Sequence, residues 1–426
     1  MPRLLDRVLI ELVDATHGLP AVLIVGPRGA GKTTTAQQRA RTVIRLDRPA
    51  ERGVVEADPD AALSVGPRPL LIDDWQLAPE VLGAVKRAVD RDFAPGQFLL
   101  TGSARADRAT SGWAGTGRVV RLALWGMTQR ELIGAGGTGN TLLSVIADPD
   151  AHMPRPADGP DLRGYVELAL RGGLPQIARS SSSVRRAMLL GAYIDQLVTR
   201  DVQLAGTRRT PSLLRNYLRA LAASTAGIPA TERLLAAAGI DRATSQAYDD
   251  VLESLMVTER VPAYVNNHLN RLASRPKRYL TEPSLLGPLL GIDERAVLRD
   301  VDLLGRVIDT YVAAQLRPEL ELVVPRPQLL HVRDTNGEHE IDLIVEYPDA
   351  SVVAFKIRAT AAPDHHDGRH LRWLRDRIGD RFRRGVVLHT GPHAFQHEAD
   401  IWYLPIAAFW ETGRSRFKAR PAARRA

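Results

Sequence analysis

The chain contains no cysteine among its 426 residues, which excludes disulfide bonds, thiolate zinc sites and a cysteine nucleophile. It has no run of 18 apolar residues, so the sequence predicts no membrane-spanning helix. The first 18 residues carry acids within their apolar stretch, unlike a secretory signal. These absences lead us to expect a cytoplasmic protein with no membrane partner.

Lysine is also scarce, because only five of the 57 basic residues are Lys. Each Lys is therefore a position where an ammonium group could be specifically required. The net charge of +8 is compatible with an anionic partner. Hydrophobic residues make up 44% and charged residues 25% of the chain, which are ordinary values for folded proteins, and the length favours two or three domains.

Short apolar runs separated by helical patterns characterise the first part of the chain. Nearly continuous hydrophobic strands with helical connections are typical of a parallel sheet covered on both faces, so we expect an α/β domain here. The expected strands are 21–25, 42–46, 69–73, 97–101 and 118–124. Further strands are expected near 319–324, 328–333, 340–346, 351–358 and 385–389. The domain boundaries that we predict are 1–135 for the α/β domain, 136–210 for a linker and helical segment, 211–283 for helices followed by a hairpin, 284–412 for a second α/β domain and 413–426 for a basic tail.

The segment GPRGAGKT, which begins at Gly26, fits the phosphate-binding pattern G-x-x-x-x-G-K-[ST]. Glycines allow backbone N–H groups to curl around phosphates, and a following helix adds its positive dipole. We expect Lys32 to reach the β- and γ-phosphates of ATP and the Thr33 hydroxyl to bind Mg²⁺. The predicted nucleotide-binding residues are Gly26, Pro27, Arg28, Gly29, Ala30, Gly31, Lys32, Thr33 and Thr34.

Asp73 ends the apolar run 69–73, and a second acid, Asp74, follows it directly. In P-loop enzymes the first acid holds the Mg²⁺ shell, and the next often orients or deprotonates the attacking water. We therefore predict that Asp73 is a metal-shell residue and that Asp74 is catalytic. Asp74 is one methylene shorter than the Glu that is usual there. The alternative interpretation is a solvated acidic end of a strand.

Polar and basic side chains at the next two strands are further catalytic candidates. Thr101 ends the run 97–101 and Ser103 lies two residues beyond it. In ATPases with an extra strand between the two motif strands, a polar residue at this strand end sits beside the γ-phosphate. A simple exit from a strand is the alternative. Arg118 is a candidate arginine finger or sensor from the same or a neighbouring subunit, and Arg105 is the second candidate.

The chain resembles prokaryotic AAA-type ATPases with a C-terminal DUF4143 region. Its N-terminal part resembles the AAA_14 domain through GPRGAGKTT, LLIDDWQLAPEVLGAVKRAVD, LLTGSAR and GRVVRLALWGMTQRE. Its C-terminal part matches through LRGGLPQ, TRDV, RPKRYLTEPSL, HEIDLIVE and the closing VVLHTG and LPIAAFW. The resemblance covers nearly the whole chain. It implies a winged-helix middle domain and an α/β C-terminal domain resembling the PD-(D/E)xK nuclease fold.

Residues 211–275 have the pattern of three helices followed by a hairpin, which is that of a winged helix-turn-helix. The third helix carries Asp249, Asp250 and Glu253, and these acids disfavour its insertion into a DNA groove. The hairpin is basic and is the better partner for phosphates. Winged helices also bind proteins, so both alternatives stay open. The predicted DNA-binding residues of this domain are Arg271, Arg275, Lys277 and Arg278.

The nuclease-like resemblance implies a helix acid, a strand Asp and an E-x-K strand, which together bind a divalent metal and activate water. Asp309 and Asp342 occupy the two acid positions. Lys356 stands where Glu is expected and Arg358 where Lys is expected. We therefore predict a nuclease-like fold that has lost its activity, and the gained cations Lys356 and Arg358 are candidates for binding a DNA backbone.

A further polar group, Asp364, His365, His366, Asp367 and His370, resembles a metal cluster in composition, but we favour a solvated polar loop. Taken together, the motifs predict an ATP- and Mg²⁺-dependent ATPase that acts on DNA by binding, remodelling or translocation and that forms a homo-oligomer. The alternative is a nucleotide-driven switch or scaffold for protein partners, in defence or toxin control. An active nuclease is a third alternative, which the sequence argues against.

Overall fold

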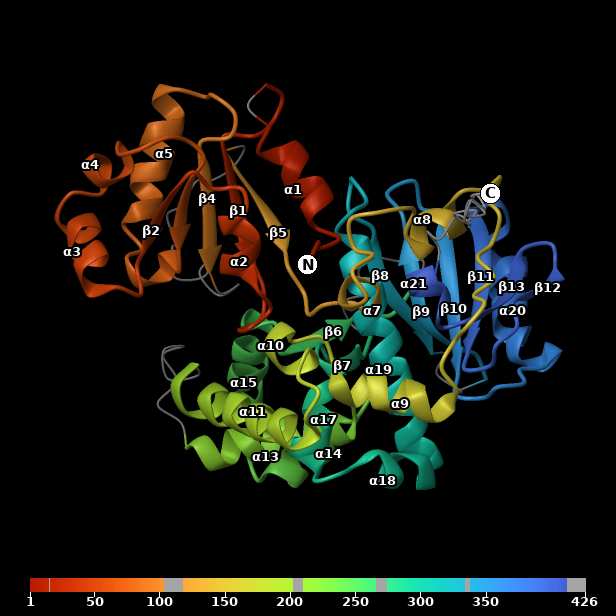
Figure 1. Cartoon of the computed structure of the whole chain (residues 1–426). Helices are drawn as coiled ribbons and strands as arrows, with labels where there is room; N and C mark the ends of the chain where they lie inside the picture. The colour runs from red at the N-terminus through yellow and green to blue at the C-terminus, as the bar shows by residue number, and fades with distance from the viewer. Residues whose placement is uncertain (15, 103–117, 202–209, 266–273, 334–337, 412–426) are drawn as a thin grey trace, which may run out of the picture.

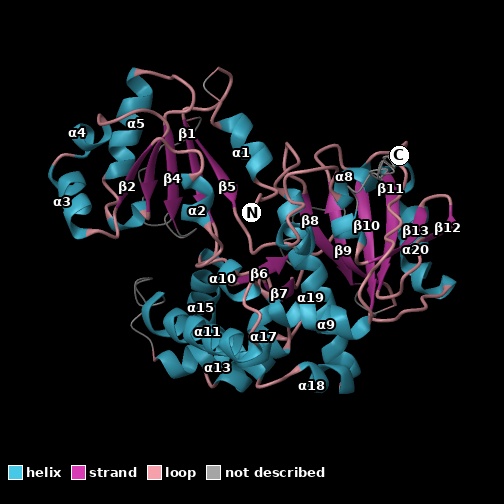
Figure 2. Ribbon diagram, viewed as in Figure 1, coloured by secondary structure: helices cyan, strands magenta, loops and turns pink. Residues whose placement is uncertain are grey.

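The N-terminal part is built on a five-stranded sheet in which every pairing is parallel (Figures 1 and 2). The computed structural model describes residues 1–14, 16–102, 118–201, 210–265, 274–333 and 338–411. The sheet order is β2-β3-β4-β1-β5. Its strands are β1 (Ala21–Val25), β2 (Thr42–Arg45), β3 (Leu70–Asp73), β4 (Phe98–Gly102) and β5 (Val119–Ala123). All five strands predicted here are therefore confirmed, and β4 lies between the strands that carry the two motifs.

Helices cover both faces of this sheet. Alternate residues of β1 enter two different hydrophobic cores, with Leu23 and Val25 on one face and Val22 and Ile24 on the other. This two-sided burial explains why the strands are hydrophobic without interruption. The helical elements are α1 (Asp6–Leu12), α2 (Lys32–Gln37), α3 (Pro49–Ala57), α4 (Pro59–Leu63), η1 (Trp75–Leu77) and α5 (Val81–Arg91).

The middle of the chain is mainly helical and ends in a two-stranded antiparallel sheet. The segment 136–210, expected as a linker and helical segment, begins with a Gly-rich stretch and contains a buried helix, α8 (Leu142–Ala147). Its apolar residues join the large core, which a Gly-rich composition does not indicate. The other elements are α7 (Gln129–Leu132), α9 (Leu162–Arg171), α10 (Pro175–Ala178), α11 (Ser183–Gln196), η2 (Leu197–Asp201), α13 (Pro211–Ala223), α14 (Thr231–Ala238), α15 (Arg242–Ser254), β6 (Thr258–Val261), β7 (Lys277–Leu280), η3 (Pro283–Leu285), α17 (Leu286–Leu290) and α18 (Glu294–Arg299).

The C-terminal part is a mixed six-stranded sheet in the order β12-β13-β11-β10-β9-β8. Pairings among β8, β9 and β10 are antiparallel, whereas β10, β11 and β13 are parallel. The elements are α19 (Val301–Leu320), β8 (Gln328–Arg333), β9 (Glu340–Glu346), β10 (Val352–Arg358), η4 (His365–Gly368), α20 (Arg369–Ile378), η5 (Gly379–Arg381), β11 (Phe382–His389), β12 (Phe395–Glu398), β13 (Ile401–Pro405) and α21 (Ala408–Glu411).

One predicted strand is wrong. Residues 319–324 do not form a strand, because α19 continues to Leu320 and a turn follows it. The helix is buried on nearly every side from Val307 onward, so its packing overrides the strand-like composition of the segment. Among the described residues, no helix is both long and apolar enough to span a membrane.

One large hydrophobic core joins the middle and C-terminal parts. It runs from Leu142 through Tyr217 and Val312 to Phe355 and Trp410. The two cores of the N-terminal sheet are separate from it, although one of them includes Met256 from the middle part. The three segments predicted between residues 136 and 412 therefore share a core.

Candidate nucleotide site

The loop after β1 has the backbone conformation of a phosphate cradle. Gly29 and Gly31 have positive φ angles of 74° and 97°, which L side chains rarely adopt. Gly26 has no space for a side chain, because a Cβ there would stand 2.1 Å from the carbonyl oxygen of Leu124. The glycines predicted from the motif are thus required by the local geometry.

Lys32 begins α2 and folds back over the loop. Its Nζ donates to the carbonyl oxygens of Gly26, at 3.0 Å, and Pro27, at 3.1 Å. Arg28 and Gly29 are exposed at the tip of the loop, while Ala30 is buried beneath it. Thr34 is exposed on the first turn of α2 and lines the adjoining cleft.

The predicted metal-shell and catalytic residues converge at the carboxyl edge of the sheet. The Thr33 hydroxyl donates to Asp73 Oδ1 at 2.8 Å, and the Thr101 hydroxyl donates to the same oxygen. Thr101 also accepts from the backbone N–H of Asp74 at 3.2 Å. Because β4 lies beside β3, it delivers Thr101 between the two acids. Ser103 and Arg105 lie outside the described residues.

Asp74 has a strained backbone and a half-buried carboxylate. Its φ of 58° is left-handed, which is uncommon for a residue other than glycine. Burial raises the pKa of Asp74 above its usual range, and the neighbouring Asp73 adds to this effect. A hydrogen bond of 3.1 Å from the Gln76 amide opposes it. Sequence reasoning missed Gln76, although it lies only two residues beyond the acids.

Arg118 lies at the amino ends of the strands, whereas the phosphate loop lies at their carboxyl ends. Val119 pairs with Ala21 at the start of β1, whereas the loop follows the end of β1 at Val25. The strand between these ends spans roughly 13 Å. Arg118 forms an ion pair with Asp90 of α5. Its predicted role toward a nucleotide on the same chain is therefore wrong, and only the role toward a neighbouring subunit remains as a hypothesis.

Arg3, which sequence reasoning also missed, fixes the loop to the rest of the domain. Its buried guanidinium donates to the carbonyl oxygens of Ala30 and Trp125, each at 2.7 Å. Its Nε pairs with Glu131 at 2.9 Å. A lone Arg near the chain start carries no motif, so only the fold reveals this role.

A cleft of about 650 Å³ opens beside the loop, where α2 faces α10 and α11. It is large enough for the base and sugar of a nucleotide. Arg179 and Arg185 on its helical side are both exposed. Its lining includes Arg3, Gly31, Thr34, Pro175, Arg179 and Arg185.

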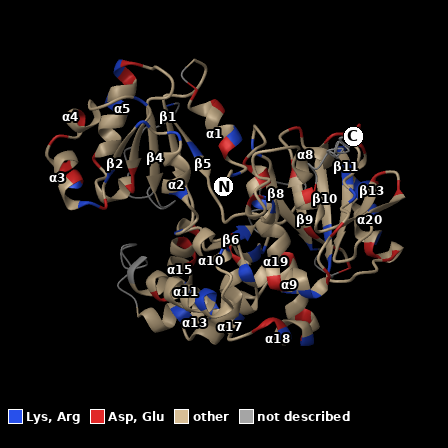
Figure 3. Ribbon diagram, viewed as in Figure 1, with Lys and Arg blue, Asp and Glu red and all other residues tan. Residues whose placement is uncertain are grey.

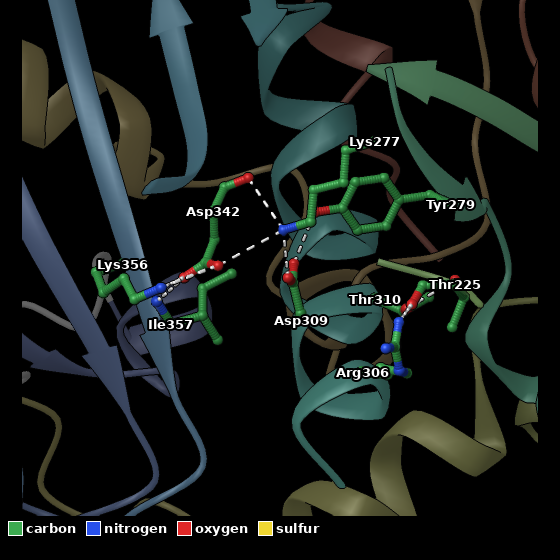
Figure 4. Close-up of polar contacts among 9 residues, drawn as sticks. All are labelled: Thr225, Lys277, Tyr279, Arg306, Asp309, Thr310, Asp342, Lys356 and Ile357. Carbon is green, nitrogen blue, oxygen red and sulfur yellow. Dashed lines mark hydrogen bonds and ion pairs between the residues drawn. The ribbon is translucent and has the colours of Figure 1, made fainter. Parts of the chain in front are cut away.

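The acid pair of the C-terminal part lies in a buried cluster with two lysines (Figure 4). Lys277 of β7 pairs with Asp309 at 2.5 Å and lies 3.6 Å from Asp342. Lys356 of β10 pairs with Asp342 at 3.2 Å. Tyr279 donates to Asp309 at 2.8 Å. The prediction that these two lysines contact DNA is wrong for this structure, because both are buried and ion-paired.

The cluster shifts the pKa values of its two carboxylates in opposite directions. Burial opposes ionisation of Asp342, but the ammonium groups of Lys356 and Lys277 lower its pKa. Burial raises the pKa of Asp309, and Lys277 only partly offsets this effect. Two ammonium groups therefore lie beside the two acids that the sequence suggested as metal ligands.

The other predicted DNA contacts have mixed outcomes. Arg278 is mostly buried and pairs bidentately with Asp249, at 2.7 and 2.9 Å, so it is not a free phosphate partner. Arg358 is half-buried and pairs with Asp367. Arg275 is exposed, so its DNA-binding role stays a prediction, and Arg271 lies outside the described residues.

The acids of α15, which we expected to disfavour insertion into a DNA groove, have basic partners within the protein. Asp249 is buried, and Glu253 pairs with Arg260. The exposed positions near the start of α15 are instead Arg242, Ala243 and Gln246. The sequence shows which residues of this helix are acidic, but it does not show which of them form ion pairs within the protein.

The polar stretch at 364–370 forms a turn and the start of a helix. The Asp364 side chain accepts from the backbone N–H groups of His366 and Asp367, and this cap organises η4. Within the described ranges, no group of three or more His, Cys, Asp or Glu residues is arranged to hold a metal ion.

Comparisons with known proteins match three successive parts of the chain. Residues 19–133 match the model of an AAA domain, residues 162–296 match a domain of unknown function (DUF8612) and residues 304–409 match a domain of unknown function (DUF4143). The chain is 28% identical over 408 residues to the uncharacterized proteins Rv2008c of Mycobacterium tuberculosis and Mb2031c of Mycobacterium bovis, over 95% of this chain and 84% of each relative. The Walker-type ATPase PABY2304 of Pyrococcus abyssi aligns with a TM-score of 0.41 and 15% identity, over 67% of this chain and 94% of that one. The N-terminal end of the chain thus matches an AAA domain, which contains the phosphate loop, and its C-terminal end matches a DUF4143 domain.

Proposed function

We propose that the protein binds ATP in the cleft beside the phosphate loop and hydrolyses its γ-phosphate. The observation that carries this proposal is the convergence of Thr33, Asp73 and Thr101 around one carboxylate oxygen, next to the loop and to Asp74. This arrangement joins phosphate binding, metal binding and water activation at one edge of a parallel sheet.

The oxygen donors of the site fit Mg²⁺. Thr33 and Asp73 offer a hydroxyl and a carboxylate within hydrogen-bond distance of each other, and Mg²⁺ prefers such hard ligands. When bound with ATP, Mg²⁺ would neutralise phosphate charge. The backbone N–H groups of the loop and Lys32 would hold the phosphates. Asp74 would orient the attacking water and accept its proton.

We further propose that the ATPase output is directed to DNA through the middle part. Three helices, α13 to α15, followed by the β6-β7 pair support a winged-helix interpretation. With Asp249 internal, the exposed start of α15 offers Arg242 and Gln246, and Arg275 is exposed before β7. Lys and Arg are interspersed with Asp and Glu over all parts of the chain (Figure 3). Contact would therefore be confined to this local surface.

Steady-state ATP hydrolysis tests both proposals. We expect hydrolysis that depends on Mg²⁺, is lost in Lys32→Ala and is stimulated by duplex, single-stranded or four-way-junction DNA. Arg242→Ala with Gln246→Ala should reduce the stimulation and leave basal hydrolysis unchanged. Absence of DNA binding at low salt, where phosphate contacts are strongest, would overturn the DNA proposal.

A protein-directed switch is the second candidate, favoured by an apolar surface beside the cleft. Val184 and Met188 lie one turn apart on α11 and are 68% and 71% exposed. Leu189 and Arg185 of the same helix line the cleft, so bound nucleotide would lie close to this surface. This candidate predicts hydrolysis indifferent to DNA and a nucleotide-dependent oligomer. A neighbouring Arg118 would complete the site of such an oligomer.

We infer that the C-terminal part has a nuclease-like fold and does not cut DNA. The inference rests on Lys277 and Lys356, whose ammonium groups lie beside Asp342. Incubation of supercoiled DNA with Mg²⁺ or Mn²⁺ tests it. Cleavage that is abolished by Asp342→Ala would overturn it.

A further inference from the structure

We propose that Gln76 is a positioning residue that holds the Asp74 carboxylate in its hydrolytic orientation, and that Gly102 leaves the space in which the Gln76 amide lies. This inference rests on the proposed ATP hydrolysis and deepens it, since it names a residue that acts through Asp74. Neither the phosphate loop nor the paired acids of the motif include Gln76 or Gly102.

The first step is the direction of the Gln76 amide. Gln76 Nε2 donates to Asp74 Oδ1 at 3.1 Å. An ionised carboxylate only accepts hydrogen bonds, so the NH₂ end of the amide must face Asp74. The Oε1 end consequently points away from the carboxylate.

The second step is the space that receives this oxygen. A Cβ on Gly102 would stand 2.6 Å from Gln76 Oε1 and 2.7 Å from Trp75 Nε1. These separations are too short for a side chain at the end of β4. Gly102 has a negative φ, so the space, and not the backbone conformation, requires glycine there.

The third step is the energetic cost of the arrangement. Gln76 Oε1 and Trp75 Nε1 are buried and have no hydrogen-bond partner among the described residues. Buried polar groups are almost always satisfied, and exceptions call for a physical reason. The Gln76 amide keeps its bond to Asp74 at the expense of its own oxygen, which points to a requirement at Asp74.

The fourth step is the set of restraints on Asp74. Its backbone is left-handed, with φ of 58°, and its N–H bonds to the Thr101 hydroxyl. Those contacts fix the main chain but do not bond to the carboxylate. Gln76 supplies such a bond, and a catalytic group displaced by about 1 Å can slow a reaction on the order of 100-fold.

The test compares kcat with nucleotide binding in Gln76→Leu. We expect kcat to fall roughly 10- to 100-fold while the Kd for a fluorescent ATP analogue changes little. Gln76→Glu should slow hydrolysis as well, because it places a second carboxylate against Asp74. Nucleotide binding by both variants shows that they are folded.

Gly102→Ala provides a steric test of the same contact. Its Cβ should displace the Gln76 amide and lower kcat without weakening nucleotide binding. The matched control is Gly53→Ala on α3, where a Cβ meets nothing within 4 Å. That control should hydrolyse ATP at the wild-type rate.

A double-variant cycle separates positioning from general damage. If Gln76 acts through Asp74, Gln76→Leu should not slow the Asp74→Asn variant further, because residues that act as a unit are not additive. Multiplicative losses, or a Gln76→Leu defect confined to binding, would overturn the inference. Wild-type hydrolysis rates in Asp74→Asn and Lys32→Ala would instead overturn the proposed function, which Gln76 variants alone cannot do.

Discussion

Single residues of the C-terminal cluster show how a buried charge is tolerated only with its partners. Lys277 is 3% exposed, and its ammonium lies against Asp309 and Asp342. Burial lowers the pKa of Lys277, but the two carboxylates outweigh burial and raise it above its usual value. The ion pairs therefore keep Lys277 charged inside the protein.

Lys277→Met should lower the free energy of unfolding by about 3–5 kcal/mol, because it leaves two buried carboxylates without their shared cation. The midpoint of urea denaturation measures this loss. The control is Lys86→Met, which removes an exposed ion pair with Asp90. Equal midpoints for the two variants would contradict a buried role for Lys277.

Glu319 is a second buried ionisable residue, and it gives stability a pH dependence. Burial raises its pKa from 4.5 to about 7, although the N–H groups of Leu143 and Leu142 donate to it. Between these pH values the folded state binds a proton that the unfolded state has released. Its contribution to stability therefore falls as pH rises from 4.5 to 7, by roughly 3 kcal/mol.

Glu319→Gln should remove this slope, because the amide oxygen can still accept from α8 but does not ionise. Denaturation midpoints measured from pH 4.5 to pH 7 test the prediction by comparison with wild type. Glu56→Gln, at an exposed ion pair on α3, is the control. An unchanged slope in Glu319→Gln would contradict it.

At the scale of elements, the sequence predicted best where local pattern and packing agree. The β1 run is apolar because both of its faces are covered, and its phosphate loop has glycines where φ is positive. The prediction of a strand at 319–324 was wrong because tertiary packing buries this part of the chain as the end of α19. The prediction that Lys277 contacts DNA was wrong for the same reason. A basic residue of a hairpin can point inward when acids that are distant in sequence lie beside it in the fold.

The same distinction applies to the candidate site. Asp73, Asp74 and Thr101 were predictable because parallel strands end at one edge. Arg3 was not, because its partners Ala30, Trp125 and Glu131 are distant in sequence and meet it only in the fold. Residues that hold a motif in place thus carry less sequence signal than the motif itself.

Arg3 also yields a prediction about the loop as an element. Arg3→Met should weaken ATP binding on the order of 10-fold, a change of about 1.4 kcal/mol, because the loop loses its anchor to Trp125 and Glu131. Titration with a fluorescent ATP analogue measures the effect, and Arg41→Met, an exposed site away from the loop, is the control. Unchanged affinity in Arg3→Met would show that the loop holds its conformation without this clamp.

At the scale of the molecule, the segment after β5 connects the ATPase part to both other parts. The Met127 N–H donates to the Gly173 carbonyl at 2.6 Å, just before α10. Trp125 Nε1 donates to Glu321 at 3.1 Å, and the Gln129 N–H donates to Gln315 of α19 at 2.7 Å. The phosphate loop touches this segment directly through Gly26 and Leu124. Only the segment after β5 therefore separates a ligand on the loop from the residues of α19 that it contacts.

We accordingly predict that ATP stabilises the C-terminal sheet as well as the N-terminal one. At 100 times its Kd, a ligand adds about 2.7 kcal/mol of stability to whatever unfolds together with its site. Amides of β10 should then exchange hydrogen up to about 100-fold more slowly with ATP, as should those of β3, and hydrogen-exchange mass spectrometry measures both. Lys32→Ala should abolish both changes. Protection restricted to the N-terminal sheet would mean that the contacts after β5 join the parts without coupling their stability, and the nucleotide signal would then have to leave the ATPase part by another surface.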